Sequence, residues 1–115
     1  MKKLEYSALV RKKLVALKER LAEQFDVDIA NKVLAGMMTD ADKLKSHSKI
    51  GTSIAELYDI DTEYWYLFTH QHYLIYRIEL KKVVIVQMFH EREDFMMKLF
   101  GISGRSQESI DYWGE

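Results

Sequence analysis

The sequence predicts an α+β domain in which a strand and a pair of helices precede a three-stranded antiparallel sheet. Two observations carry this prediction. Apolar residues of the first half recur every three or four positions, whereas the aromatic and β-branched residues between Tyr64 and Phe89 form strand-like runs. The connections between these runs are short, which indicates an antiparallel meander.

The first half of the chain contains signals for a short strand and two helices. Lys3–Tyr6 is strand-like, and Ser7 is a suitable N-cap for a helix over residues 8–24. Asp26 or Asp28 caps a second helix, and the short connection predicts an antiparallel hairpin. The apolar stripes are Val10, Leu14, Leu17, Leu21 and Phe25 in the first helix, and Ile29, Val33, Met37, Ala41 and Leu44 in the second.

The second half predicts three strands over 64–68, 73–78 and 83–89, joined by turns at 69–71 and 81–82. The last strand is apolar on both alternating faces, so we expect it to be central in the sheet. A short helix over 95–100, stopped by Gly101, follows it.

Composition limits the classes of protein that fit. The chain has 115 residues, 30% of them charged, with a net charge of −1 and no cysteine. Length suits one domain, and the near-neutral charge argues against strong nonspecific nucleic-acid binding. Without cysteine there is no disulfide framework, and no apolar run is long enough to span a bilayer. We expect a cytoplasmic protein without membrane association and without a cofactor.

Four segments resemble one known family in their order and in their places on the predicted elements. They are Leu4–Ser7 before the first helix, Gly51–Leu57 after the helical hairpin, His72–Ile78 in the middle strand, and Val83–Asp94 in the last strand and its exit. Together they resemble the RelE/ParE toxins of bacterial type II toxin–antitoxin systems, a family that includes plasmid-stabilisation proteins. The resemblance covers residues 3–96. We therefore expect a toxin domain over 1–100 and a C-terminal tail, 101–115, of unassigned role.

The resemblance implies a growth-inhibiting toxin that a cognate antitoxin neutralises. Three alternatives stay open for its action: poisoning of DNA gyrase by binding, as in the ParE branch; ribosome-dependent cleavage of messenger RNA, as in the RelE branch; or loss of toxicity with antitoxin binding retained. Leu74 follows Tyr73 where RNA-cleaving members tend to carry arginine, and Phe95 stands where a hydroxyl would serve as acid or base. These departures favour the gyrase branch. A homodimer and a toxin–antitoxin hetero-oligomer are both open.

The nuclease alternative has candidate catalytic residues. A metal-independent endoribonuclease needs an acid, a base and a cation close together. His90 could supply the acid or base, Arg92 the cation, and Arg77 lies on the adjacent strand. The acids at positions 91, 93 and 94 would partly offset Arg92. The structural alternative is that His90 ends a strand and Arg92 pairs with an acid.

A zinc site at the predicted turn is the weaker interpretation of the other histidines. His70 and His72, with His90 as a third ligand, could bind zinc if their rings converged. If Gln71 lies in the turn, the first two rings diverge. We therefore expect no metal site.

Candidate contacts to an antitoxin or target come from the basic first helix, the aromatic strands and one methionine pair. They are Arg11, Lys12, Lys18, Tyr66, Tyr76 and Met97. The alternatives are a solvated helix face for the cations and core packing for the tyrosines. One methionine of each pair, Met37-Met38 and Met96-Met97, should lie off the core stripe.

Overall fold

The computed structural model describes residues 1–101, so the tail beyond Gly101 lies outside the described residues. The elements in chain order are β1 (Lys3–Tyr6), α1 (Ala8–Gln24), α2 (Val27–Asp42), a 3-10 turn η1 (Lys43–Lys45), β2 (Thr52–Ser53), α3 (Ile54–Tyr58), β3 (Tyr64–Thr69), β4 (His72–Ile78), β5 (Lys82–His90) and α4 (Phe95–Phe100). This confirms the predicted α+β fold with its helical hairpin, meander and short last helix.

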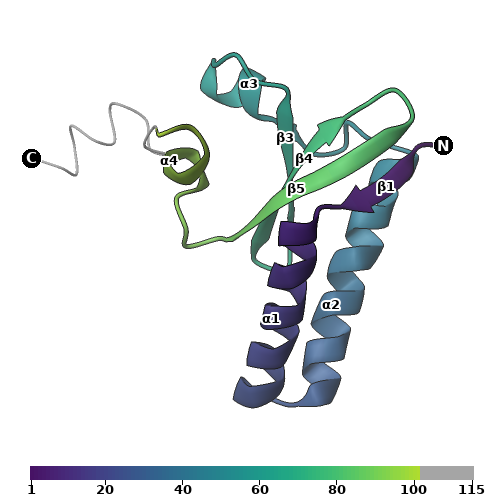
Figure 1. Ribbon diagram of the computed structural model, residues 1–115, viewed down its shortest axis with the longest axis vertical. Helices are drawn as coiled ribbons and strands as arrows, with labels where there is room; N and C mark the ends of the chain where they lie inside the picture. The colour runs from purple at the N-terminus through teal and green to yellow at the C-terminus, as the bar shows by residue number, and fades with distance from the viewer. Residues whose placement is uncertain (102–115) are drawn as a thin grey trace, which may run out of the picture.

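The sheet has the order β1-β5-β4-β3-β2 (Figure 1). β1 pairs with β5 in parallel, and the other neighbours are antiparallel. β5 is therefore flanked on both sides, as its apolar alternation predicted. Its ladder with β4 contains an irregularity at Ile75/Tyr76, where Ile75 pairs with Gln87 and Tyr76 with Ile85.

Each face of the sheet has its own core. The hairpin of α1 and α2 covers one face and buries residues that include Leu17, Met37, Leu74, Tyr76 and Ile85. The other face is covered by α3 and α4, and buries Ile54, Ile75, Phe89, Phe95 and Met96. Because successive strand side chains point to opposite faces, a strand with apolar residues at both parities has to be covered on both.

The helices begin where side chains satisfy free backbone N–H groups. The Ser7 hydroxyl accepts the N–H of Val10 at 3.2 Å, which begins α1. Of the two candidate caps for α2, Asp26 is the one used: its Oδ1 accepts the N–H of Ile29 at 2.7 Å. These local bonds explain why both helix starts could be predicted from the sequence.

The structure differs from the sequence prediction in three details. Residues 52–58, for which no element was predicted, form β2 and α3; Ser53 caps a helix of five residues that is too short to show a periodic pattern. Thr69 and His72 pair within the ladder, so only His70 and Gln71 make the first turn, with φ of 47° and 64°. Lys82 begins β5, and Glu79 N–H bonds to its carbonyl at 2.8 Å to close the second turn.

Tyr76 fixes the loop that follows η1. Its side chain is fully buried; the hydroxyl donates to the Ser48 carbonyl at 2.8 Å and accepts the N–H of Gly51 at 3.2 Å. Gly51 lies so close that an added Cβ would collide with the same hydroxyl and with the Tyr66 carbonyl. Burial raises the pKa of Tyr76 to about 12.

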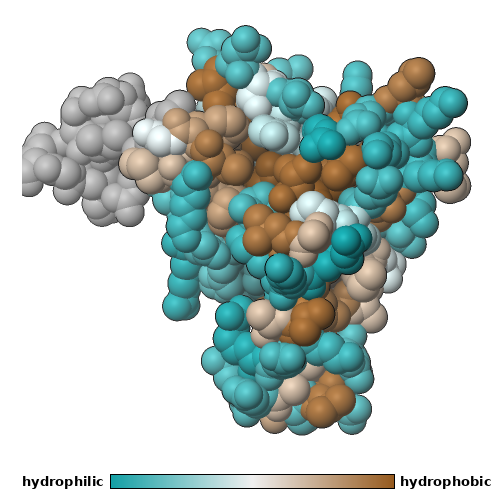
Figure 2. All heavy atoms as spheres, in the orientation of Figure 1, coloured by the Kyte–Doolittle hydropathy of each residue, from teal (hydrophilic) through white to brown (hydrophobic). Residues whose placement is uncertain are grey.

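The molecule is flat, with dimensions of 44 × 38 × 21 Å. The helical hairpin extends beyond the sheet, so its far end lies past the strands (Figure 1). Hydrophobic side chains reach the surface over the sheet and around this far end (Figure 2). The end of α1 and the start of α2 expose Phe25, Val27 and Ile29. None of the helices in the described region, residues 1–101, has the length and apolarity needed to cross a membrane.

Candidate binding site

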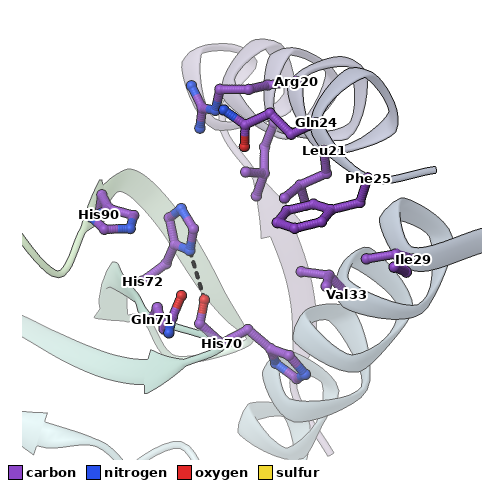
Figure 3. A pocket seen from close by; sticks show the side chains of 11 residues that line it. Arg20, Leu21, Gln24, Phe25, Ile29, Val33, His70, Gln71, His72 and His90 are labelled. Atoms are coloured by element: carbon purple, nitrogen blue, oxygen red, sulfur yellow. Dashed lines mark hydrogen bonds between the residues drawn. The ribbon is translucent and has the colours of Figure 1, made fainter. Parts of the chain in front are cut away.

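A cleft of about 570 Å³ lies between the free end of the hairpin and the end of the sheet where β4 begins and β5 finishes. One wall comes from α1 and α2, and the other from the β3–β4 turn and the last residue of β5 (Figure 3). The lining residues are Leu17, Arg20, Leu21, Gln24, Phe25, Ile29, Val33, His70, Gln71, His72 and His90. A smaller hollow of about 210 Å³ shares Arg20, His72 and His90 and adds Lys13 and Glu93.

Two imidazoles form the polar wall of this cleft. His72 and His90 are register partners in the β4–β5 ladder, and their rings meet edge to face with centroids 5.1 Å apart. His72 Nδ1 lies 2.8 Å from the His70 carbonyl, so this nitrogen carries a proton and donates (Figure 3). His90 Nδ1 instead accepts the N–H of Arg92 at 3.1 Å, which places the proton of its neutral ring on Nε2.

The surroundings of His72 disfavour its protonated form. Burial is the main cause that lowers its pKa, and the charges of His90 and Arg20 lower it further, while the bond to the His70 carbonyl and the charge of Glu93 act in the opposite direction. His72 thus packs against a second histidine and shares the cleft with Arg20.

His70 points away from His72 and fixes the turn on α2. Thr69 donates its hydroxyl to Asp40 at 2.6 Å and lies 2.8 Å from His70 Nδ1. The Thr69 hydroxyl is the main cause that lowers the pKa of Asp40. The His70 ring lies over Gly36, where an added Cβ would come within 2.5 Å of its Cε1. Gly36 thus allows close packing of the β3–β4 turn on α2.

The exit of β5 is tied back by Glu93. Its carboxylate accepts the N–H of His90 at 2.9 Å and pairs with Lys98 of α4. Burial alone would raise the pKa of Glu93, but these two hydrogen bonds lower it. On the α1 side, Lys13 donates to Gln87 Oε1 at 2.6 Å and to the Met88 carbonyl at 2.8 Å.

The structure does not bring the three candidate catalytic residues together. His90 and Arg92 are close together, since the Arg92 N–H bonds to His90 Nδ1. Arg77 pairs with Val84 while His72 pairs with His90, so five residues of β4 separate Arg77 from His90 by about 17 Å at roughly 3.3 Å per residue. Arg77 also lies at the strand parity of Ile75, on the opposite face, where it bonds Glu79 at 2.7 Å. The expectation that Arg77 shares a nuclease site with His90 is therefore wrong for this fold.

The candidate binding residues divide between surface and interior. Arg11, Lys12 and Lys18 are exposed on α1, and Met97 is half exposed on α4, as is Met38 on α2, whereas Met37 and Met96 are buried. Tyr66 lies in an aromatic cluster against Tyr73 and Phe95. Tyr76 is buried on the other face and offers no contact surface in this fold, because its hydroxyl is used by the loop.

Among residues 1–101, no group of three or more histidines or acids is arranged to hold a metal ion. The predicted divergence of His70 and His72 is the reason at this turn, since Gln71 does occupy it. Sequence reasoning missed Arg20 and Phe25 as parts of a site. Arg20 follows buried Leu17 by three positions, a spacing that turns a helical side chain toward the covered face.

Comparison with known proteins decides the family. Residues 4–95 match the family model described as the ParE toxin of type II toxin–antitoxin systems, parDE. The chain belongs to the ParE toxin family. Membership in a type II system implies a cognate antitoxin as partner. A search of curated proteins found no match.

A solved structure shares the fold of this ParE family member. It is described as the chromosomal ParDE TA system from P. aeruginosa and superposes with a TM-score of 0.66. The match covers 78% of this chain and 96% of that chain at 13% sequence identity, which supports the fold and nothing finer.

Proposed function

We propose that this ParE family member is a cytoplasmic toxin that poisons DNA gyrase by binding it, and that its cognate antitoxin neutralises it. Membership in the ParE family over residues 4–95 supports the toxin role. Gyrase inhibition by binding needs a docking surface and no assembled acid, base and cation. The exposed cations of α1, Arg11, Lys12 and Lys18, are the surface we propose for target or antitoxin contact.

The observation that carries this choice over RNA cleavage is the separation of Arg77 from His90 and Arg92. Leu74, where RNA-cleaving relatives tend to carry arginine, is buried under the helical hairpin. Phe95 is buried in the aromatic cluster on the other face. Metal-free RNA cleavage needs general acid–base groups and a cation around one phosphate, and these residues do not supply that arrangement.

Regulated expression in a bacterium tests the proposal. We expect growth to stop, a DNA-damage response to appear, and messenger RNA to stay intact when its 5′ ends are mapped. In-frame cuts within translated codons would replace gyrase poisoning with the ribosome-dependent nuclease. Normal growth at high expression would leave only the antitoxin-binding role.

A further inference from the structure

The cleft of Figure 3 combines two kinds of wall that recognise different chemistry. Arg20, His72 and His90 form a polar wall with a permanent positive charge. Leu21, Phe25, Ile29 and Val33 form an apolar wall. Arg20 and the apolar residues come from the hairpin, whereas the two imidazoles come from β4 and β5, so a ligand that lies between them contacts the hairpin and the sheet at once.

The apolar wall is left uncovered by the fold. Phe25 is 61% exposed and Ile29 40% exposed, at the end of the hairpin that extends past the sheet. Neighbouring large apolar side chains that remain exposed at the rim of a cleft are typical of an interaction site. Covering them would contribute about 25 cal/mol for each Å² removed from water.

We propose that this cleft binds an acidic amphipathic segment of the cognate antitoxin, with a carboxylate at Arg20 and the two imidazoles and a large apolar side chain against Phe25 and Ile29. The proposal rests on the proposed function, since it assigns a toxin surface to the antitoxin. The antitoxin segment contributes one acid and one large apolar side chain, which reach the polar wall and the apolar wall respectively.

Charge favours a carboxylate in this place. Arg20 is permanently protonated, and His90 can donate from its Nε2 because its Nδ1 accepts the N–H of Arg92. Glu93, the acid that lines the adjoining hollow, is already bonded to Lys98 and to the backbone of His90. The negative charge of Glu93 is therefore already balanced, and it competes little with an incoming carboxylate for the donors of the cleft.

A protein segment fits better than a nucleic acid. Nucleic-acid affinity comes from several phosphates neutralised by several cations. Here Arg20 lines the cleft, while the Nζ of nearby Lys13 already bonds Gln87 and the Met88 carbonyl. The chain as a whole has a net charge of −1. One carboxylate with an apolar neighbour matches this arrangement.

Binding of a carboxylate should take up a proton. The groups that face His72 are Arg20 and Lys13 from α1, His90 from β5, and Glu93 from the exit of β5, while the His70 carbonyl accepts from its Nδ1. Burial and the nearby positive charges lower the pKa of His72, and a bound carboxylate would raise it. By linkage, affinity should increase as pH falls from 8 to 6.

The test measures affinity by titration calorimetry between the full-length chain and the protein encoded by the adjacent reading frame. Arg20→Gln and Phe25→Ala should each weaken binding at least tenfold, since each removes one wall of the contact. Lys32→Gln and Val27→Ala are matched controls, an exposed cation and an exposed apolar residue outside the cleft, and should stay within about threefold. Circular dichroism checks that every variant is folded.

The pH arm compares the wild type with His72→Gln. Wild-type affinity should rise between pH 8 and pH 6, and the variant, which keeps His90, should show a smaller rise. Unchanged affinity in both Arg20→Gln and Phe25→Ala would overturn this proposal and leave the proposed function intact. Loss of binding to a single-stranded oligonucleotide in Arg20→Gln, with antitoxin affinity unchanged, would overturn it in favour of a nucleic-acid site. Failure of the wild type to bind the adjacent protein would count against the proposed function itself.

Discussion

At the scale of single residues, buried polar groups explain where the loops are held. Tyr76 is the clearest case, because one hydroxyl satisfies both the Ser48 carbonyl and the Gly51 N–H. Buried polar groups that lose a partner cost about 1–3 kcal/mol, which exceeds the net value of most hydrogen bonds. This tyrosine therefore stabilises the 46–51 loop and the start of β2 beyond it.

We expect Tyr76→Phe to lower the free energy of unfolding by about 1–2 kcal/mol, because it leaves the Ser48 carbonyl and the Gly51 N–H without their shared partner. Urea denaturation measures the change. Tyr64→Phe, in the half-buried cluster on the other face, is the matched control and should cost no more than about 0.5 kcal/mol. Equal losses in the two variants would show that the hydroxyl of Tyr76 has no special role.

At the scale of elements, the position of the β3–β4 turn on α2 depends on one glycine. In a helix interior, Gly→Ala normally gains about 1 kcal/mol. At Gly36 the new Cβ would meet the His70 ring, which would have to move and lose its contact with Thr69. Two neighbouring elements thus share one small space.

Gly36→Ala should stabilise the protein by about 1 kcal/mol only when His70→Ala is also present. In the wild-type background the gain should be smaller or reversed, with a coupling of about 1 kcal/mol in a double-mutant cycle. Asn31→Ala, on the exposed side of α2, is the control and should give the same change in both backgrounds. Additive effects of Gly36→Ala and His70→Ala would contradict the contact.

Many helix and strand boundaries are set by residues close in sequence and could be predicted, whereas the cleft depends on tertiary arrangement and could not. Ser7 and Asp26 bond within three residues of themselves, so a sequence alone indicates both helix starts. The meeting of Arg20 with His72 and His90 depends on how far α1 extends past the sheet and on the β4–β5 register. Neither quantity is encoded in a local pattern.

Alternation along β4 places two of its tyrosines on opposite faces of the sheet. Tyr73 and Tyr76 differ by an odd number of positions on one strand, so they point to opposite faces. The structure accordingly puts Tyr73 in the aromatic cluster and Tyr76 under the helices. Which face the helices cover is set by tertiary packing, and α3 escapes prediction because one short turn has no period.

At the scale of the whole molecule, the fold presents surfaces rather than an assembled catalytic centre. A two-sided core holds the sheet rigid, the hairpin extends beyond it, and Arg77 lies far from His90 and on the other face. A toxin of this construction should act by occupying its target.

The measurement that tests it most directly is DNA supercoiling by purified gyrase in the presence of the purified toxin. We predict that supercoiling falls and that linear DNA accumulates after detergent treatment, because a bound toxin would trap the cleaved complex. A fivefold excess of antitoxin added first should prevent both effects. Unchanged supercoiling at toxin excess, together with cleavage of messenger RNA on ribosomes, would contradict the account.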